Sequence, residues 1–144
     1  MKNIIIGIFS LGLLVTSNFL LANSDVLSSE LESVIMEHSA ATSKDSESID
    51  DLMKTMHPES PITMHLKTAM EQMFPVFDME TSVIEFHFIG MSGDYVVTRV
   101  KQKLEKISGP ASFKSNVSEQ VFVFKKNQGK WKIWQAVMLD MDYL

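Results

Sequence analysis

The chain has 144 residues, with 13 lysines and arginines against 18 aspartates and glutamates, so its formal net charge is −5. An acidic surface repels phosphate backbones, so we expect no nucleic acid among its partners. The sequence contains no cysteine, which excludes disulfides and a lipidated N-terminal cysteine and leaves stability to the hydrophobic core.

The N-terminus has the pattern of a signal peptide. Lys2 precedes an almost uninterrupted apolar run over residues 4–21, and the small residues Ala22 and Ser24 fit a cleavage site. Acidic residues follow the run where a retained membrane anchor normally has a basic cluster. We therefore expect cleavage after Ser24.

Two regions follow from this pattern. Residues 1–24 are predicted to be the signal peptide, and residues 25–144 are predicted to form one domain, since about 120 residues suffice for a single core. We expect a secreted or periplasmic protein that has no membrane contact once the signal is removed. Without Lys2 the net charge becomes −6.

Helical periodicity occupies the first half of this domain. Ser29 and Glu32 have capping-box spacing, which predicts a first helix from there to about residue 41. Ser48 is the expected N-cap of a short second helix that ends at His57-Pro58. A third helix is predicted to start at Ser60-Pro61.

From residue 81 the apolar period changes from 3.6 to 2, which indicates strands. We expect them at residues 83–89, 95–107, 116–126 and 130–141, with a hairpin turn at 127–129. Helices first and antiparallel strands last predict an α+β fold whose helices cover one face of the sheet.

Three phrases in this order resemble the nuclear transport factor 2-like superfamily, which includes the SnoaL-like polyketide cyclases, the ketosteroid isomerases and small exported proteins. They are LMKTMHP at 52–58, GDYVV at 93–97 and GKWKIW at 129–134. The resemblance implies three N-terminal helices on a curved, cone-shaped, four-stranded antiparallel sheet with a pocket at its open end. It does not imply a particular reaction.

The residues that serve ketosteroid isomerases do not carry over. Their catalytic base lies on a segment between the second and third helices, and residues 57–61 are too short for that segment. Gln120 stands where those enzymes have an oxyanion-binding acid, and residues 34–36 supply no hydroxyl. We therefore favour a domain that is not an enzyme.

An enzymatic alternative uses other ionisable residues. Glu85 and His87 lie two apart on one predicted strand and share a face, with Val100 and Thr98 expected opposite them. Together, or with His57, they could transfer protons in a cyclase, dehydratase or isomerase. They could equally form a polar rim of the sheet, and His57 could cap the second helix.

Three glutamines interrupt otherwise apolar strands at Gln102, Gln120 and Gln135. They could orient a ligand or satisfy one another as buried amides. His38 closes the apolar stripe of the first helix and is treated as a boundary residue. The candidate ligand-binding residues are therefore His57, Glu85, His87, Gln102, Gln120 and Gln135.

The chain has 11 methionines. Pairs such as Met53 and Met56 or Met70 and Met73, near histidines, could hold Cu(I) in an exported protein. The same residues recur at the spacing of buried helical stripes, so we interpret them as core residues. No metal site and no cofactor are expected.

Apolar residues also occupy the second face of the last hairpin, which we predict to be Val121, Val123, Trp134, Ala136 and Met138. A hairpin that is apolar on both faces should be covered on both. Related folds dimerise through this surface, so we expect a homodimer. The leading hypothesis is an exported domain that binds a small apolar molecule or serves as a dimeric interaction module.

Overall fold

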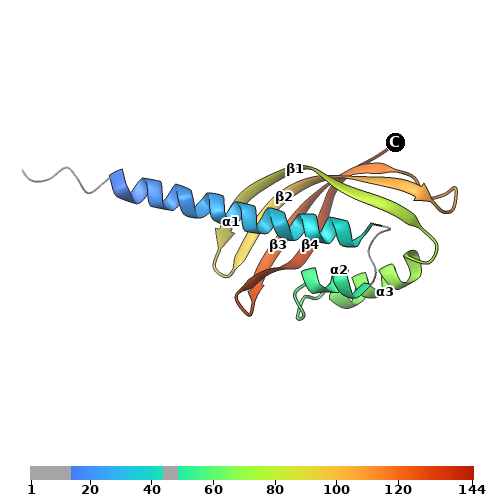
Figure 1. Cartoon of the computed structure of the whole chain (residues 1–144), viewed down its shortest axis with the longest axis horizontal. Helices are drawn as coiled ribbons and strands as arrows, with labels where there is room; N and C mark the ends of the chain where they lie inside the picture. The colour runs from blue at the N-terminus through green and yellow to red at the C-terminus, as the bar shows by residue number, and fades with distance from the viewer. Residues whose placement is uncertain (1–13, 44–48) are drawn as a thin grey trace, which may run out of the picture.

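The computed structural model describes the backbone of residues 14–43 and 49–144, and the side chains of residues 24–43 and 49–144. Three helices precede four strands in the chain (Figure 1). The elements are α1 (Leu14–Ala41), α2 (Ile49–Thr55), α3 (Thr63–Met73), β1 (Asp78–Ser92), β2 (Tyr95–Ser108), β3 (Asn116–Asn127) and β4 (Lys130–Tyr143).

The four strands form one antiparallel sheet in the order β1-β2-β3-β4. The sheet curves around α1, which lies along its concave face, and α2 and α3 lie together below α1 (Figure 1). The predicted α+β architecture, with three helices on a curved four-stranded antiparallel sheet, is therefore confirmed.

Helix α1 begins earlier than the sequence pattern predicted. Ser29 lies inside it and is not an N-cap; its carbonyl accepts a hydrogen bond from Oγ of Ser33 at 2.9 Å. The helix continues beyond the sheet at its N-terminal end (Figure 1). Among the described residues, no helix is both long and apolar enough to cross a membrane.

Two expectations concern residues outside the described part of the chain. Residues 1–13, which hold most of the predicted signal peptide, are not described, and neither is the predicted N-cap Ser48. The described backbone runs helically through the predicted cleavage position after Ser24. The signal peptide therefore stays a prediction.

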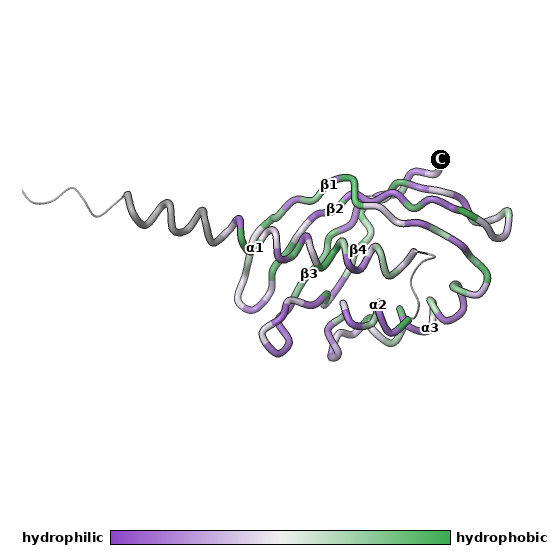
Figure 2. Tube along the Cα trace, viewed as in Figure 1, coloured by the Kyte–Doolittle hydropathy of each residue, from purple (hydrophilic) through white to green (hydrophobic). Residues whose placement is uncertain are grey.

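The strands carry both hydrophobic and hydrophilic residues (Figure 2). Burial alternates along much of β2 and β3, so one face of the sheet packs against the helices. The main core joins α1 to this face and to the end of α2. Its fully buried members are Leu31, Ile35, Met56, Val96, Val100, Phe122, Phe124 and Ile133. The hairpin turn between β3 and β4 was predicted correctly, since Gln128 and Gly129 both have positive φ, at 50° and 81°.

A second, smaller core cluster lies where the C-terminal end of α1 meets α2 and α3. Its buried members are Ala41, Leu52, Met70 and Met79. The segment after α2 joins the helical layer to the sheet, because Met56 bridges Ile133 on β4 in parallel and the N–H of His57 donates to the Ile133 carbonyl at 2.8 Å.

Bulges alter the register that simple alternation predicts. In β1 the register shifts between Phe88 and Gly90, so His87 lies opposite Arg99 and Glu85 lies opposite Lys101. The expected partners Thr98 and Val100 lie opposite Phe88 and Phe86 instead. Ile89 is the inserted residue, since it has no partner on β2. One inserted residue turns the side chains beyond it to the opposite face of the sheet, so the predicted register was wrong by one residue.

The last hairpin contains two further bulges on β4, where Leu139 and Trp134 have no register partner on β3. Ala136 therefore lines the cavity beside the core, and Met138, although 47% exposed, lines a neighbouring open hollow. Their predicted position on the second face was wrong, because alternation does not continue across a bulge.

Candidate functional site

A cavity of about 220 Å³ lies beside the two core clusters, between α1, α3, the segment that follows α2 and the concave face of the sheet. Most of its wall is apolar and rich in methionine. The lining residues are His38, Ser39, Thr42, Met56, Ile62, Leu66, Met70, Met73, Met79, Thr81, Gln102, Leu104, Gln120, Phe122, Ile133 and Ala136. None of these side chains carries a carboxylate, an ammonium or a guanidinium group.

His38 projects from the last turns of α1 into this wall. Its Nδ1 lies 2.7 Å from Oγ1 of Thr55, and its ring meets the ring of Phe122 edge-on at 6.2 Å between centroids. Burial lowers the pKa of His38 to about 4, since desolvation disfavours the charged imidazolium. The side chain is therefore neutral near pH 7.

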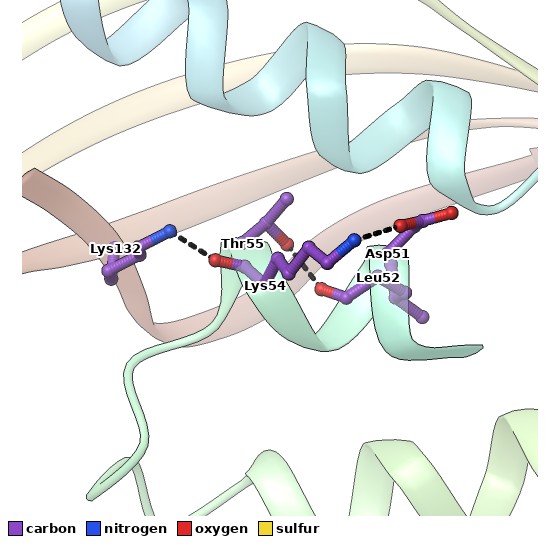
Figure 3. Close-up of polar contacts among 5 residues, drawn as sticks. All are labelled: Asp51, Leu52, Lys54, Thr55 and Lys132. Carbon is purple, nitrogen blue, oxygen red and sulfur yellow. Dashed lines mark hydrogen bonds and ion pairs between the residues drawn. The ribbon is translucent and has the colours of Figure 1, made fainter. Parts of the chain in front are cut away.

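The end of α2 holds Thr55 in place (Figure 3). Thr55 is buried, and its hydroxyl donates to the carbonyl of Leu52 at 2.7 Å. The ammonium of Lys132 on β4 donates to the carbonyl of Lys54, which fixes the C-terminal end of α2 to the sheet. Lys54 also pairs with Asp51 at 2.5 Å.

A chain of hydrogen bonds joins the cavity wall to α1. Nε2 of Gln102 donates to Oγ of Ser39 at 2.8 Å, and Oε1 of Gln102 accepts from Nε2 of Gln120 at 3.2 Å. Nε2 of Gln120 also donates to Oγ of Ser118 at 3.2 Å. Both protons of the Gln120 amide are thereby used, and its carbonyl oxygen is left as an acceptor.

A second hollow of about 290 Å³ adjoins the first and shares Thr81, Gln102, Leu104 and Gln120 with it. Its outer wall includes Met138, Met141 and Tyr143 from β4 and Phe113 from the β2–β3 connection. The two glutamines thus stand between two neighbouring spaces. The site is an apolar hollow with a small number of fixed polar groups, as is typical of small-molecule sites.

Of the predicted ligand-binding residues, the structure brings Gln102 and Gln120 together in the cavity wall. The hydrogen bond between them confirms that these two amides satisfy each other, and both also line the hollow. Their role in orienting a ligand stays a prediction. Gln135 does not join them. It lies opposite Val123 and is absent from the linings of both hollows.

Glu85 and His87 lie on the outer face of β1. Their side chains are 53% and 64% exposed, and Nε2 of His87 is 3.5 Å from Oε2 of Glu85. Phe86 and Phe88, on the opposite parity, pack against the core. The pair therefore forms a polar rim in solvent, and the register that would have turned it inward was wrong.

His57 is buried but does not line the cavity. Its ring meets Trp134 edge-on at 5.0 Å, and its Nδ1 accepts a hydrogen bond from the N–H of Glu59 at 3.1 Å. This nitrogen organises the turn that follows α2. The predicted capping role, donation to the last carbonyls of the helix, is therefore wrong.

Comparison with known families matches residues 33–144 to the C-terminal domain of the anti-sigma-I factor RsgI9. The chain belongs to this family. No curated protein matches the sequence significantly.

Two solved structures share the fold of this RsgI9 C-terminal domain family member. A proposed aromatic ring hydroxylase from Novosphingobium aromaticivorans superposes with a TM-score of 0.64 at 10% identity, covering 80% of this chain and 91% of that one. A type 2 hexachlorocyclohexane dehydrochlorinase, LinA, gives 0.55 at 12% identity, covering 87% and 90%. At these identities the likeness establishes the cone fold alone.

The residue that the sequence analysis missed in this RsgI9-type domain is His38. It follows Leu31 and Ile35 at helical spacing on the same stripe of α1, and both of those residues are fully buried. That spacing places position 38 toward the interior. The signal was present in the sequence, but the stripe alone could not show that a cavity lies beside it.

Proposed function

We propose that this domain is an exported, non-enzymatic binding module that takes up a small, largely apolar molecule in the cavity between α1, α3 and the sheet. One observation carries the proposal: a hollow of about 220 Å³ is bounded by methionines and other apolar side chains, with a few hydrogen-bonding groups and no charged side chain. Such a lining favours neutral, apolar occupants.

The methionines suit this role. Met56, Met70, Met73 and Met79 line the cavity, and unbranched thioether side chains adapt their rotamers to guests of different shape. The family is named for a domain of an anti-sigma factor. Uptake of a small molecule by a domain of a regulatory protein is a means of signal input and requires no chemistry.

The enzymatic alternative is not carried forward. Glu85 and His87 meet in solvent on the outer face of the sheet, and His57 packs against Trp134 outside the cavity lining. General acid–base catalysis requires such groups within hydrogen-bond reach of a bound substrate.

Ala136→Leu tests the proposal, because Ala136 lines the cavity and a larger side chain there occupies its volume. Val137→Leu is the matched control on the neighbouring, 46% exposed position. We expect small aromatic and aliphatic compounds to raise the melting temperature of the wild type and of Val137→Leu, but not that of Ala136→Leu.

Native mass spectrometry of the same three proteins provides the second readout. We expect bound compound in the wild type and the control only. If no compound from a panel of hydrocarbons, alcohols, phenols and short fatty acids binds the wild type, the proposed function is wrong. Equal binding to Ala136→Leu would place the ligand elsewhere.

A further inference from the structure

The protonation of the His38 ring is fixed by its neighbours. Thr55 has one hydroxyl proton, and it is directed to the carbonyl of Leu52 at 2.7 Å (Figure 3). The same oxygen lies 2.7 Å from Nδ1 of His38. Because the threonine proton is already used, the hydrogen bond between Thr55 Oγ1 and His38 Nδ1 requires a proton on Nδ1. A neutral imidazole then carries no proton on Nε2.

Nε2 of His38 is consequently a hydrogen-bond acceptor with an unused lone pair. It has no hydrogen-bonding partner among the described residues, and His38 lines the cavity. The ring itself is held between Thr55 and the edge contact with Phe122. A guest that reaches this edge of the ring would therefore meet an oriented acceptor.

The hydrogen bonds of Gln102 and Gln120 do not fix which of their groups donate and which accept. The hydroxyls of Ser39 and Ser118 stand at the two ends of this chain of hydrogen bonds, and a hydroxyl can donate or accept. Both amides can therefore reverse together without loss of a hydrogen bond. His38 has no such freedom, since the other partner of Thr55 is a backbone carbonyl.

The surroundings restrict which donors can reach His38. An ammonium ion is also a donor, but no carboxylate lines the cavity, and an unpaired charge is costly to bury. A cavity of about 150 Å³ holds benzene, so about 220 Å³ leaves room for a substituted ring or a branched chain of similar size.

We propose that the cavity is specific for neutral, mainly apolar molecules that bear a hydroxyl group, which donates its hydrogen bond to Nε2 of His38. This inference rests on the proposed function and adds the chemical class of the ligand. The His38–Thr55–Leu52 chain acts as the recognition element, and the methionine-rich wall accepts the hydrocarbon part.

The test compares 4-ethylphenol with 4-ethylanisole, its methyl ether, which retains the ring and oxygen but cannot donate. Binding is measured by isothermal titration to the wild type, to His38→Phe and to the control His65→Phe, an exposed histidine on α3. We expect the wild type and the control to prefer the phenol by roughly five- to tenfold, the effect of one neutral hydrogen bond. His38→Phe should show no preference.

Thr55→Val provides a second variant that keeps the imidazole and removes the group that fixes its proton. We expect both neutral tautomers in this variant and a reduced preference for the phenol. Long-range ¹H–¹⁵N spectra of histidine-labelled wild type should show an unprotonated Nε2 whose resonance shifts when the phenol binds, and not when the ether binds.

The outcomes separate the two proposals. If phenol and ether bind the wild type equally well, or if Nε2 carries the proton, the assignment of His38 is wrong while the cavity remains a binding site. If neither compound binds and the wider panel also fails, the proposed function is wrong as well. If His38→Phe still prefers the phenol over the ether, the ligand hydroxyl donates to a group other than His38.

Discussion

Gln102 on β2 and Gln120 on β3 form a side-chain hydrogen bond of 3.2 Å although they are not register partners. Gln102 lies opposite Ser118, and Gln120 lies opposite Val100, so the bond is diagonal across the two strands. It brings an amide chain from Ser39 on α1 to the edge of the cavity. The polar part of the site is therefore built into the sheet and is held by packing on both strands.

Replacement of Gln102 by leucine should cost more stability than replacement of Gln120. Gln102 is buried and bonds to both Ser39 and Gln120, so its loss leaves buried polar groups unpaired, at a cost of about 1–3 kcal/mol. Gln120 is only half-buried. Urea denaturation checks this order, with Gln135→Leu as control. Equal destabilisation by Gln102→Leu and Gln120→Leu would contradict this order.

Stability should fall between pH 6.5 and pH 4 because of His38. Burial lowers its folded pKa from 6.5 to about 4, so the unfolded chain binds more protons in this window and ΔG of unfolding decreases as the pH falls. For such a shift the loss between pH 7 and pH 5 is about 2 kcal/mol.

The variant His38→Phe should lack this component, which is measured as the difference between its urea midpoints and those of the wild type at pH 7 and pH 5. His65→Phe serves as the control, since His65 is exposed. Identical pH dependence in the wild type and His38→Phe would show that the imidazole is not desolvated.

We propose that two copies associate through the outer face of the last hairpin. Val121 and Val137 are register partners across β3 and β4, and Val137 and Leu139 are 46% and 52% exposed. An apolar area of this kind favours a protein contact. Light scattering should give the mass of a dimer at micromolar concentration.

Val137→Lys should shift that mass toward the monomer, because a lysine cannot be buried there without a partner. Thr68→Lys, at an exposed position on α3, should leave it unchanged. A wild-type protein that is strictly monomeric at these concentrations overturns the proposal.

Removal of the predicted signal peptide should leave the domain intact. Among the described side chains of α1, those that pack in the main core are Leu27, Val34 and the fully buried Leu31 and Ile35, all of them after Ser24. The chain 25–144 should therefore have an unchanged melting temperature. Intact mass of the protein recovered from the periplasm or medium checks whether the mature form begins at Asp25.

A chain that starts at residue 32 is the matched control, since it lacks the core residues Leu27 and Leu31. It should lose several kcal/mol or fail to fold, because deletion of one large buried side chain already costs about 2–5 kcal/mol. If both truncated chains were equally stable, the inference that Leu27 and Leu31 of α1 stabilise the core would be wrong.

Much of the candidate site could be anticipated from the sequence, but its orientation could not. Gln102 and Gln120 stand out as amides in apolar strands, and both reach the cavity. Glu85 and His87 stand out equally and lie in solvent. What separates these pairs is a bulge in β1, and a bulge has no reliable signature in a period of two.

The sequence by itself determined the order of the elements, the change from helical to strand period near residue 81, and the turn at Gln128-Gly129. These features depend on local backbone preferences and on spacing along the chain. Only the tertiary structure decided which strand faces meet the helices, because each bulge exchanges the two faces of a strand. It also brought Thr55 to His38, 17 positions earlier in the chain, where it fixes the proton of the imidazole ring. A hollow is enclosed only when helices and sheet pack, so no single segment of the sequence encodes it.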